Sequence, residues 1–301
     1  MATVSPYLYV GLPLGACVLI QNGWAPACAF IWDGDVLGGR RLRRLAHSLG
    51  LENRYHFTDD IDGVLARAPR TSTAGDNPTG PLSMHALSCC HGGLLWYWPR
   101  RLPVELLAAL GGPMLGLHPS LLPSFRGPDP FFWSIASGST ETGVSLYRVD
   151  EDYDTGPVIL QSKIAIPETQ TALGLSRSLD RLSLRLLPLV AAQLAEGRSW
   201  AGVAQSPSSG SWAPRPRATH LRVHWSASVA VLERLARAAR PTYSLIANLG
   251  GQEVRLRSLR RHTGRVPIGL PVGTAFQEAG TVCVCCADGA VAVELATFGV
   301  G

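Results

Sequence analysis

The order of hydrophobic and polar positions in the first part of the chain predicts alternating strands and helices. An apolar strand at residues 7–10 ends in a turn that begins at Gly11, an apolar helical stretch follows at 16–20, and a second apolar strand lies at 27–32. Strand, turn, helix and strand in this order begin a parallel βαβ unit. The turn carries only part of the glycine fingerprint of dinucleotide-binding proteins, so a dinucleotide site is not predicted.

The same alternation continues along the middle of the chain. The spacing of apolar residues predicts helices over 40–49, 103–110, 131–137 and 173–196, and strands over 84–88, 114–117, 143–149 and 158–166. Residues 70–81 are rich in Thr, Ser, Gly, Asp, Asn and Pro, which is typical of a surface loop. We therefore expect an α/β domain with a Rossmann-like, mostly parallel sheet that is flanked by helices.

A change in composition near residue 206 divides the chain. Residues 206–217 contain four Ser, three Pro and one Gly, a composition typical of a linker. The pattern after this segment predicts one helix and several short strands, over 228–239, 243–248, 253–259, 281–286 and 290–294. The predicted domains are a larger domain over 1–205, a linker over 206–218 and a smaller β-rich, OB-like domain over 219–301.

Composition and charge exclude several classes of protein. Hydrophobic residues make up 46% of the chain, which is enough for a packed core, so a disordered protein is excluded. The net charge of +5 is spread over 301 residues, and we interpret the arginines at 40–44 and 255–261 as solvated faces rather than a nucleic-acid surface. No apolar run reaches the about 18 residues of a spanning helix, and the N-terminus has no basic signal-peptide segment. We expect a cytoplasmic protein with no membrane partner.

The cysteines predict neither a disulfide framework nor a metal site. Their number, seven, is odd, and the cluster at 283–286 fits an alternating apolar strand better than a zinc ligand set. Cys89 and Cys90 lie next to His91 without an evident activating base. We therefore interpret both as core residues rather than nucleophiles.

Two side chains that suit proton transfer lie beyond predicted strands. His118 comes just after the strand at 114–117, and the carboxyl ends of strands in an open parallel sheet face the ligand crevice. Asp154 precedes a Thr-Gly turn, from which its carboxylate can reach back to His118. A neighbouring carboxylate orients a histidine ring and favours its charged form. Taken alone, a loop histidine and a turn-capping aspartate are the simpler interpretation of these two residues.

The motif around the two residues changes that interpretation. Residues 116–127 read GLHPSLLPSFRG, residues 141–144 read ETGV and residues 154–156 read DTG. This long, ordered series resembles the formyltransferase family that uses 10-formyltetrahydrofolate, which includes methionyl-tRNA formyltransferase and the sugar N-formyltransferases. Weaker similarity extends to 97–107 and 222–237. The resemblance implies the family's fold and an acyl-transfer reaction.

In that family an Asn, a His and an Asp form the catalytic trio. His118 and Asp154 match two of them, whereas Gly116 stands at the position of the Asn. The family's Asn donates a hydrogen bond to the developing oxyanion, and loss of one such donor costs about 10²–10³ in rate. With glycine there, another donor replaces the amide, water fills the gap, or the chemistry differs. Glycine also leaves room beside His118 that a larger or different acyl-like group could occupy.

The resemblance also implies binding residues. The cofactor would be 10-formyltetrahydrofolate or another one-carbon tetrahydrofolate, held by Trp98, Arg100, Arg101, Leu102, Asp150, Asp152 and Tyr153. The substrate-binding candidates are Gly11, Pro13, Ser120 and Arg126. Ser120 has no nucleophile elbow around it, so a hydrolase triad is not predicted.

The function that this resemblance implies is transfer of a formyl or related one-carbon group to a primary amine. The acceptor would be a small molecule such as an amino sugar, an amino-acid derivative or a natural product. In this reaction His118 accepts a proton or stabilises the oxyanion, and Asp154 orients His118 and helps to relay a proton to the leaving nitrogen.

Several alternatives remain open at this point. They are methionyl-tRNA formylation, hydrolysis of formyltetrahydrofolate, and a repurposed protein of this fold whose chemistry is changed or lost because the Asn is missing. Nucleic acid is disfavoured as a partner, although tRNA is not excluded. A homodimer is compatible with the sequence.

Overall fold

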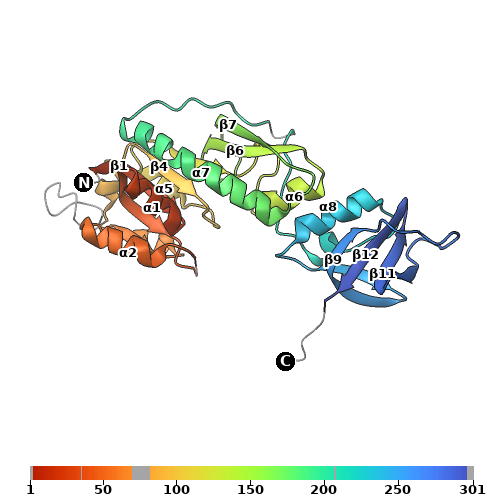
Figure 1. Ribbon diagram of the computed structural model, residues 1–301. Helices are drawn as coiled ribbons and strands as arrows, with labels where there is room; N and C mark the ends of the chain where they lie inside the picture. The colour runs from red at the N-terminus through yellow and green to blue at the C-terminus, as the bar shows by residue number, and fades with distance from the viewer. Residues whose placement is uncertain (1–2, 35, 70–81, 207, 297–301) are drawn as a thin grey trace. The chain divides into compact units, whose positions relative to one another are not determined.

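The computed structural model describes residues 3–34, 36–69, 82–206 and 208–296, so the predicted loop at 70–81 lies outside them. The chain forms two compact units (Figure 1). The first unit comprises residues 1–126, 143–163 and 179–211, and the second comprises 127–142, 164–178 and 212–301. The change of unit at residues 211–212 falls inside the segment predicted as a linker, and two segments from the middle of the chain join the C-terminal unit.

A seven-stranded sheet runs through the first unit in the order β3-β2-β1-β4-β5-β6-β7. Its strands are β1 (Thr3–Gly11), β2 (Trp24–Ile31), β3 (Tyr55–Phe57), β4 (Gly93–Trp96), β5 (Met114–His118), β6 (Glu141–Arg148) and β7 (Val158–Ala165). The strands from β3 to β5 pair in parallel, and β6 pairs with β5 in the antiparallel sense. The prediction of a Rossmann-like, mostly parallel sheet is confirmed.

Helices connect and flank these strands. They are α1 (Pro13–Gln21), α2 (Gly39–Ser48), α3 (Ile61–Arg67), α4 (Met84–Ser88), α5 (Val104–Ala109), α6 (Pro130–Ala136), which belongs to the second unit, and α7 (Ala172–Ala195). The interior strand β1 is buried on both faces, since Tyr7, Leu8 and Tyr9 have no exposed surface. Burial on both faces explains why β1 reads as a continuous apolar run.

One element was predicted wrongly. Residues 84–88 form the helix α4 and not a strand, because the Ser83 side chain accepts a hydrogen bond from the Ala86 N–H and caps the helix. The place in the sheet next to β1 belongs instead to β4, which begins at Gly93. This strand was not predicted, because it is only four residues long, begins with a glycine and runs into the aromatic residues that start at Trp96.

The second unit contains a five-stranded antiparallel sheet in the order β10-β11-β12-β9-β8. Its elements are a 3₁₀ helix (Ala218–Leu221), α8 (Val229–Ala239), β8 (Leu245–Leu249), β9 (Gln252–Arg261), β10 (Ala275–Glu278), β11 (Thr281–Cys286) and β12 (Gly289–Leu295). The smaller β-rich domain is confirmed, and the cysteine cluster at 283–286 lies in β11 as a buried strand. No helix in the described parts of the chain is long and apolar enough to cross a membrane.

The register of the sheet places three strand ends side by side. Gly11 of β1 pairs with Trp96 of β4, and Trp96 pairs with Leu117 of β5, immediately before His118. Gly11 must be glycine, because its φ is +153° and a Cβ there would lie 2.1 Å from the Trp96 carbonyl oxygen. The carboxyl ends of β1, β4 and β5 therefore form one edge, where an open α/β sheet binds its ligands.

Candidate active site

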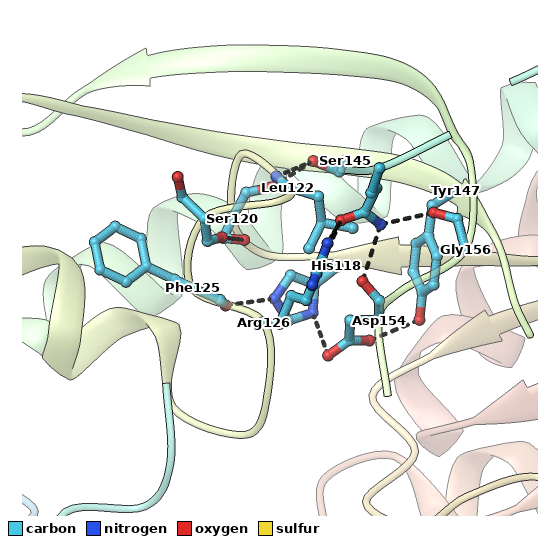
Figure 2. Close-up of polar contacts among 11 residues, drawn as sticks. His118, Ser120, Leu122, Phe125, Arg126, Ser145, Tyr147, Asp154 and Gly156 are labelled. Carbon is cyan, nitrogen blue, oxygen red and sulfur yellow. Dashed lines mark hydrogen bonds and ion pairs between the residues drawn. The ribbon is translucent and has the colours of Figure 1, made fainter. Parts of the chain in front are cut away.

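The candidate site is built around His118, the last residue of β5. The residue is 6% exposed, and its ring lies between two oxygen atoms. Its Nε2 is 3.0 Å from the Phe125 carbonyl oxygen, and its Nδ1 is 3.4 Å from Oδ2 of Asp154 (Figure 2). The imidazole and the carboxylate that the sequence singled out therefore lie together.

Asp154 is fixed from two sides. The Tyr147 hydroxyl donates a hydrogen bond of 2.7 Å to Oδ1, and the Gln205 side-chain amide donates to the Asp154 backbone carbonyl at 2.9 Å. Asp154 has a φ of 57°, in the left-handed region that a non-glycine residue occupies at a cost of about 1 kcal/mol. Such backbone persists only where neighbouring contacts impose it, and these two bonds supply such contacts.

The loop after His118 is held by buried hydroxyl groups. Ser120 donates to the Ser124 carbonyl at 2.6 Å, and Ser145 of β6 donates to the Ser120 carbonyl at 2.6 Å and accepts from the Leu122 N–H (Figure 2). Ser120 is completely buried. Its hydroxyl is therefore committed to the loop, contrary to its prediction as a substrate contact, because the loop closes over it.

Arg126 lies at the end of the same loop. Its guanidinium donates two hydrogen bonds, at 3.0 and 2.8 Å, to the side-chain oxygen of Gln205. Gln205 in turn donates to the carbonyls of Asp154 and Gly156. Arg126 thus ties the His118 loop to the Asp154 loop through Gln205, a residue that no sequence motif marked.

The space beside Gly116 is occupied. Gly116 pairs directly with Tyr147 across β5 and β6, and a Cβ at Gly116 would lie 2.4 Å from Cε1 of the tyrosine ring and 3.0 Å from its hydroxyl. The expectation that glycine leaves room here for a ligand is therefore wrong. Burial, together with the charge of Asp154, raises the pKa of the Tyr147 hydroxyl well above its ordinary value, so this group stays protonated and acts as a hydrogen-bond donor.

Residues 94–191, which contain His118, Tyr147 and Asp154, match a model of the family described as formyl transferase. Residues 94–191 belong to the formyl transferase family. The chain is 33% identical over 177 residues to a methionyl-tRNA formyltransferase of Synechococcus sp. (strain JA-3-3Ab), covering 58% of this chain and 54% of the relative. It is 48% identical over 73 residues to a GDP-perosamine N-formyltransferase of Brucella melitensis biotype 1, covering 24% of this chain and 28% of the relative.

The chain therefore spans about half, or less, of the length of these curated relatives. Among solved structures, an N-formyltransferase from Helicobacter canadensis superposes with a TM-score of 0.66 at 13% identity, covering 97% of this chain and 100% of the other. This likeness shows that the formyl transferase fold extends beyond the matched segment.

The predicted folate-binding residues of the formyl transferase domain fall into two segments that meet. The Arg101 guanidinium lies 3.0 Å from Asp152 and 5.1 Å from the centre of the Tyr153 ring. Trp98 packs edge-on against Trp32, with ring centres 5.4 Å apart. Arg101 thus links the loop after β4 to the loop that carries Asp154.

Other predicted residues of the domain have local roles. Leu102 is buried and packs in the core, and its contact with a folate stays a prediction. Arg100 forms an ion pair of 2.9 Å with Asp59, and Asp150 accepts a hydrogen bond from the Thr155 hydroxyl. Pro13 is buried at the first turn of α1. No group of three or more metal-ligating side chains occurs among the residues that the structure describes.

Proposed function

We propose that the protein transfers a formyl or related one-carbon group from a tetrahydrofolate to the primary amine of a small molecule. The observation that carries this proposal is the His118 ring, held between the Phe125 carbonyl and the Asp154 carboxylate within a formyl transferase domain. The acceptor is an amino sugar, an amino-acid derivative or a natural product. The similarity to the GDP-perosamine N-formyltransferase supports a sugar-like acceptor.

The residues of the two folate-binding segments suit such a cosubstrate. Trp98, Tyr153 and the aliphatic part of Arg101 offer flat apolar surface for a pterin ring. Arg100 and Arg101 keep 55% and 58% of their side chains exposed, and their surface ion pairs are weak, so both can also contact the carboxylates of a folate tail. The similar structure from Helicobacter canadensis is described as a complex with folinic acid and dTDP-3-aminofucose. The bound tetrahydrofolate supplies an activated one-carbon group and a leaving nitrogen.

Both ring nitrogens of His118 face oxygen atoms that accept hydrogen bonds. Nε2 lies 3.0 Å from the Phe125 carbonyl oxygen and Nδ1 lies 3.4 Å from the Asp154 carboxylate, so the one hydrogen of the neutral ring can be donated to only one of them. In the proposed reaction the other ring nitrogen takes the proton of the attacking amine, and the Asp154 carboxylate stabilises the charged ring.

We place the reaction in residues 1–205, joined through 206–218 to the β-rich domain of 219–301. We also place it in the cytoplasm, because all seven cysteines are free, as is usual in a reducing compartment. Because the basic residues are not concentrated in one long run, and because one relative is a sugar N-formyltransferase, we favour a small amine over tRNA as the acceptor. A homodimer is compatible with the proposal.

Replacing His118 tests the proposal directly. With 10-formyltetrahydrofolate and a panel of amino sugars and amino acids, we expect the His118→Ala variant to lower kcat/KM by about 10²–10⁴. Folate binding, measured by calorimetry, is expected to stay close to that of the wild type. His47→Ala, which changes an exposed histidine of α2, is the matched control.

The same assay separates the alternatives. Formylation of charged initiator tRNA with strong salt dependence would favour the tRNA formyltransferase, the family of the 177-residue match. Formate release without any acceptor would indicate hydrolysis. Absence of folate binding would contradict the proposed function and leave a repurposed fold.

A further inference from the structure

Gly116 and Tyr147 form a complementary pair in the middle of the site. They are opposite each other in the antiparallel pairing of β5 and β6, and their contact is with the ring of the tyrosine rather than with its backbone. The three atoms that a Cβ at Gly116 would meet first are Cε1, Cζ and the hydroxyl oxygen of Tyr147, at 2.4, 2.7 and 3.0 Å. Real Cβ atoms do not approach other atoms so closely, so glycine at this position is what admits the ring.

The tyrosine hydroxyl ends on the carboxylate that faces His118. Oδ1 of Asp154 accepts the hydroxyl hydrogen at 2.7 Å, which leaves Oδ2 as the oxygen near Nδ1 of the imidazole, 3.4 Å away. A carboxylate held on one oxygen cannot rotate freely, so the other oxygen keeps its direction. Figure 2 shows Tyr147, Asp154 and His118 as one connected series.

Packing alone does not account for a tyrosine here. Phenylalanine would fill the same volume and would not place a hydroxyl in the interior, where a polar group without a partner is costly. The Tyr147 hydroxyl donates to the charged Asp154 carboxylate, and hydrogen bonds to a charged group are about twice as strong as neutral ones. This hydrogen bond orients Asp154, the residue beside the proposed base His118.

We propose that Tyr147 is a positioning residue of the transfer reaction, which directs Asp154 toward His118, and that Gly116 is glycine because this tyrosine needs its space. The inference rests on the proposed function. It assigns a role to a strand residue outside the sequence motif, and it explains why the position of the family's Asn carries no side chain.

The first test removes only the hydroxyl. We expect Tyr147→Phe to lower kcat/KM by about 10- to 100-fold, the effect of losing a hydrogen bond to a charged group, while the Kd for 10-formyltetrahydrofolate changes less than about twofold. The acidic limb of the kcat/KM profile is expected to move to higher pH, because the carboxylate loses a donor. Tyr55→Phe is the control, since Tyr55 is also buried and donates to the Pro26 carbonyl on another part of the sheet.

A readout independent of activity accompanies this test. In protein labelled with ¹⁵N-histidine, Tyr147→Phe is expected to change the ring signals of His118, and Tyr55→Phe to leave them unchanged. An unchanged kcat/KM profile together with unchanged His118 signals would overturn the inference, even if the wild type transfers the one-carbon group. If the wild type itself transfers no one-carbon group, the proposed function is overturned. The His118 ring signals would then still test whether Tyr147 positions Asp154 beside His118.

The second test addresses the glycine. Gly116→Ala is expected to lower both the Tm and the activity, because its methyl group displaces the Tyr147 ring. When Tyr147 is replaced by Val, Gly116→Ala is expected to lower the Tm much less than it does in the wild type. The Tm changes of the two substitutions are therefore not additive. A Gly116→Ala variant with the stability and activity of the wild type would contradict the proposed complementarity.

Discussion

At the level of single residues, Asp154 is the residue of the site that contacts His118, Tyr147 and Gln205. Its carboxylate lies next to His118 and accepts from Tyr147, and its carbonyl accepts from Gln205. The motif around His118 and Asp154 was enough to predict that these two meet. Tyr147 could not be predicted, because within an alternating strand it reads as an ordinary core residue. The tyrosine becomes significant only through its pairing with Gly116 across two strands.

A half-buried histidine elsewhere provides a pH prediction at this scale. His56 lies on β3 with its Nε2 buried and without a hydrogen-bond partner among the described residues, and burial lowers its pKa below the ordinary 6.5. The unfolded chain therefore binds a proton at His56 more readily than the folded chain does. Folding stability contributed by the neutral ring is present above pH 6.5 and is lost as the pH falls below it.

We expect His56→Phe to reduce the loss of unfolding free energy between pH 7 and pH 5. Urea denaturation at both pH values measures this difference, with the exposed His47→Phe as control. Equal pH dependence in the wild type and the His56→Phe variant would contradict the predicted shift.

At the level of elements, the parallel strands β1, β2 and β5 were predicted well because burial on both faces makes them continuous apolar runs. Short elements were predicted poorly. The helix α4 (Met84–Ser88) has the apolar content of a strand, and only the bond between Ser83 and the Ala86 N–H identifies it as a capped helix. β3 and β4 contain only three and four residues. Each is recognised as a strand by its pairing with a neighbouring strand and not by its own sequence pattern.

The cap of α4 leads to a stability prediction. We expect Ser83→Ala to lower the unfolding free energy by about 1 kcal/mol, because the Ala86 N–H loses its acceptor. Ser48→Ala, at an exposed serine that donates to the Leu45 carbonyl, is expected to change it much less. Chemical denaturation of the three proteins measures the difference, and an effect no larger than that of Ser48→Ala would show that the cap does not stabilise the fold.

At the level of the whole molecule, the site depends on contacts between distant parts of the chain. Gln205 is 79 residues from Arg126 and 51 from Asp154, and it joins the loops that carry them. It lies at the border of a Ser- and Pro-rich segment with no motif of its own. For this reason its role could not be read from the sequence.

Removing this link is expected to reduce activity more than stability. Gln205→Ala frees the Arg126 guanidinium and two carbonyl groups, so we expect kcat/KM to fall by about tenfold, the effect of about one hydrogen bond. Gln252→Ala, at an exposed residue of β9, is the control. Steady-state kinetics and thermal denaturation of both variants test this prediction, and a Gln205→Ala enzyme with wild-type kinetics would contradict it.

The sequence by itself determined the order of most of the longer elements, the division into an α/β part and a β-rich part, and the proximity of His118 and Asp154. It could do so because hydrophobic periodicity and short motifs are local properties that each segment carries alone. Only the tertiary structure decided what fills the space at Gly116, where Ser120 directs its hydroxyl, and which residue joins the two loops of the site. These features depend on side chains that meet across strands and loops far apart in the chain.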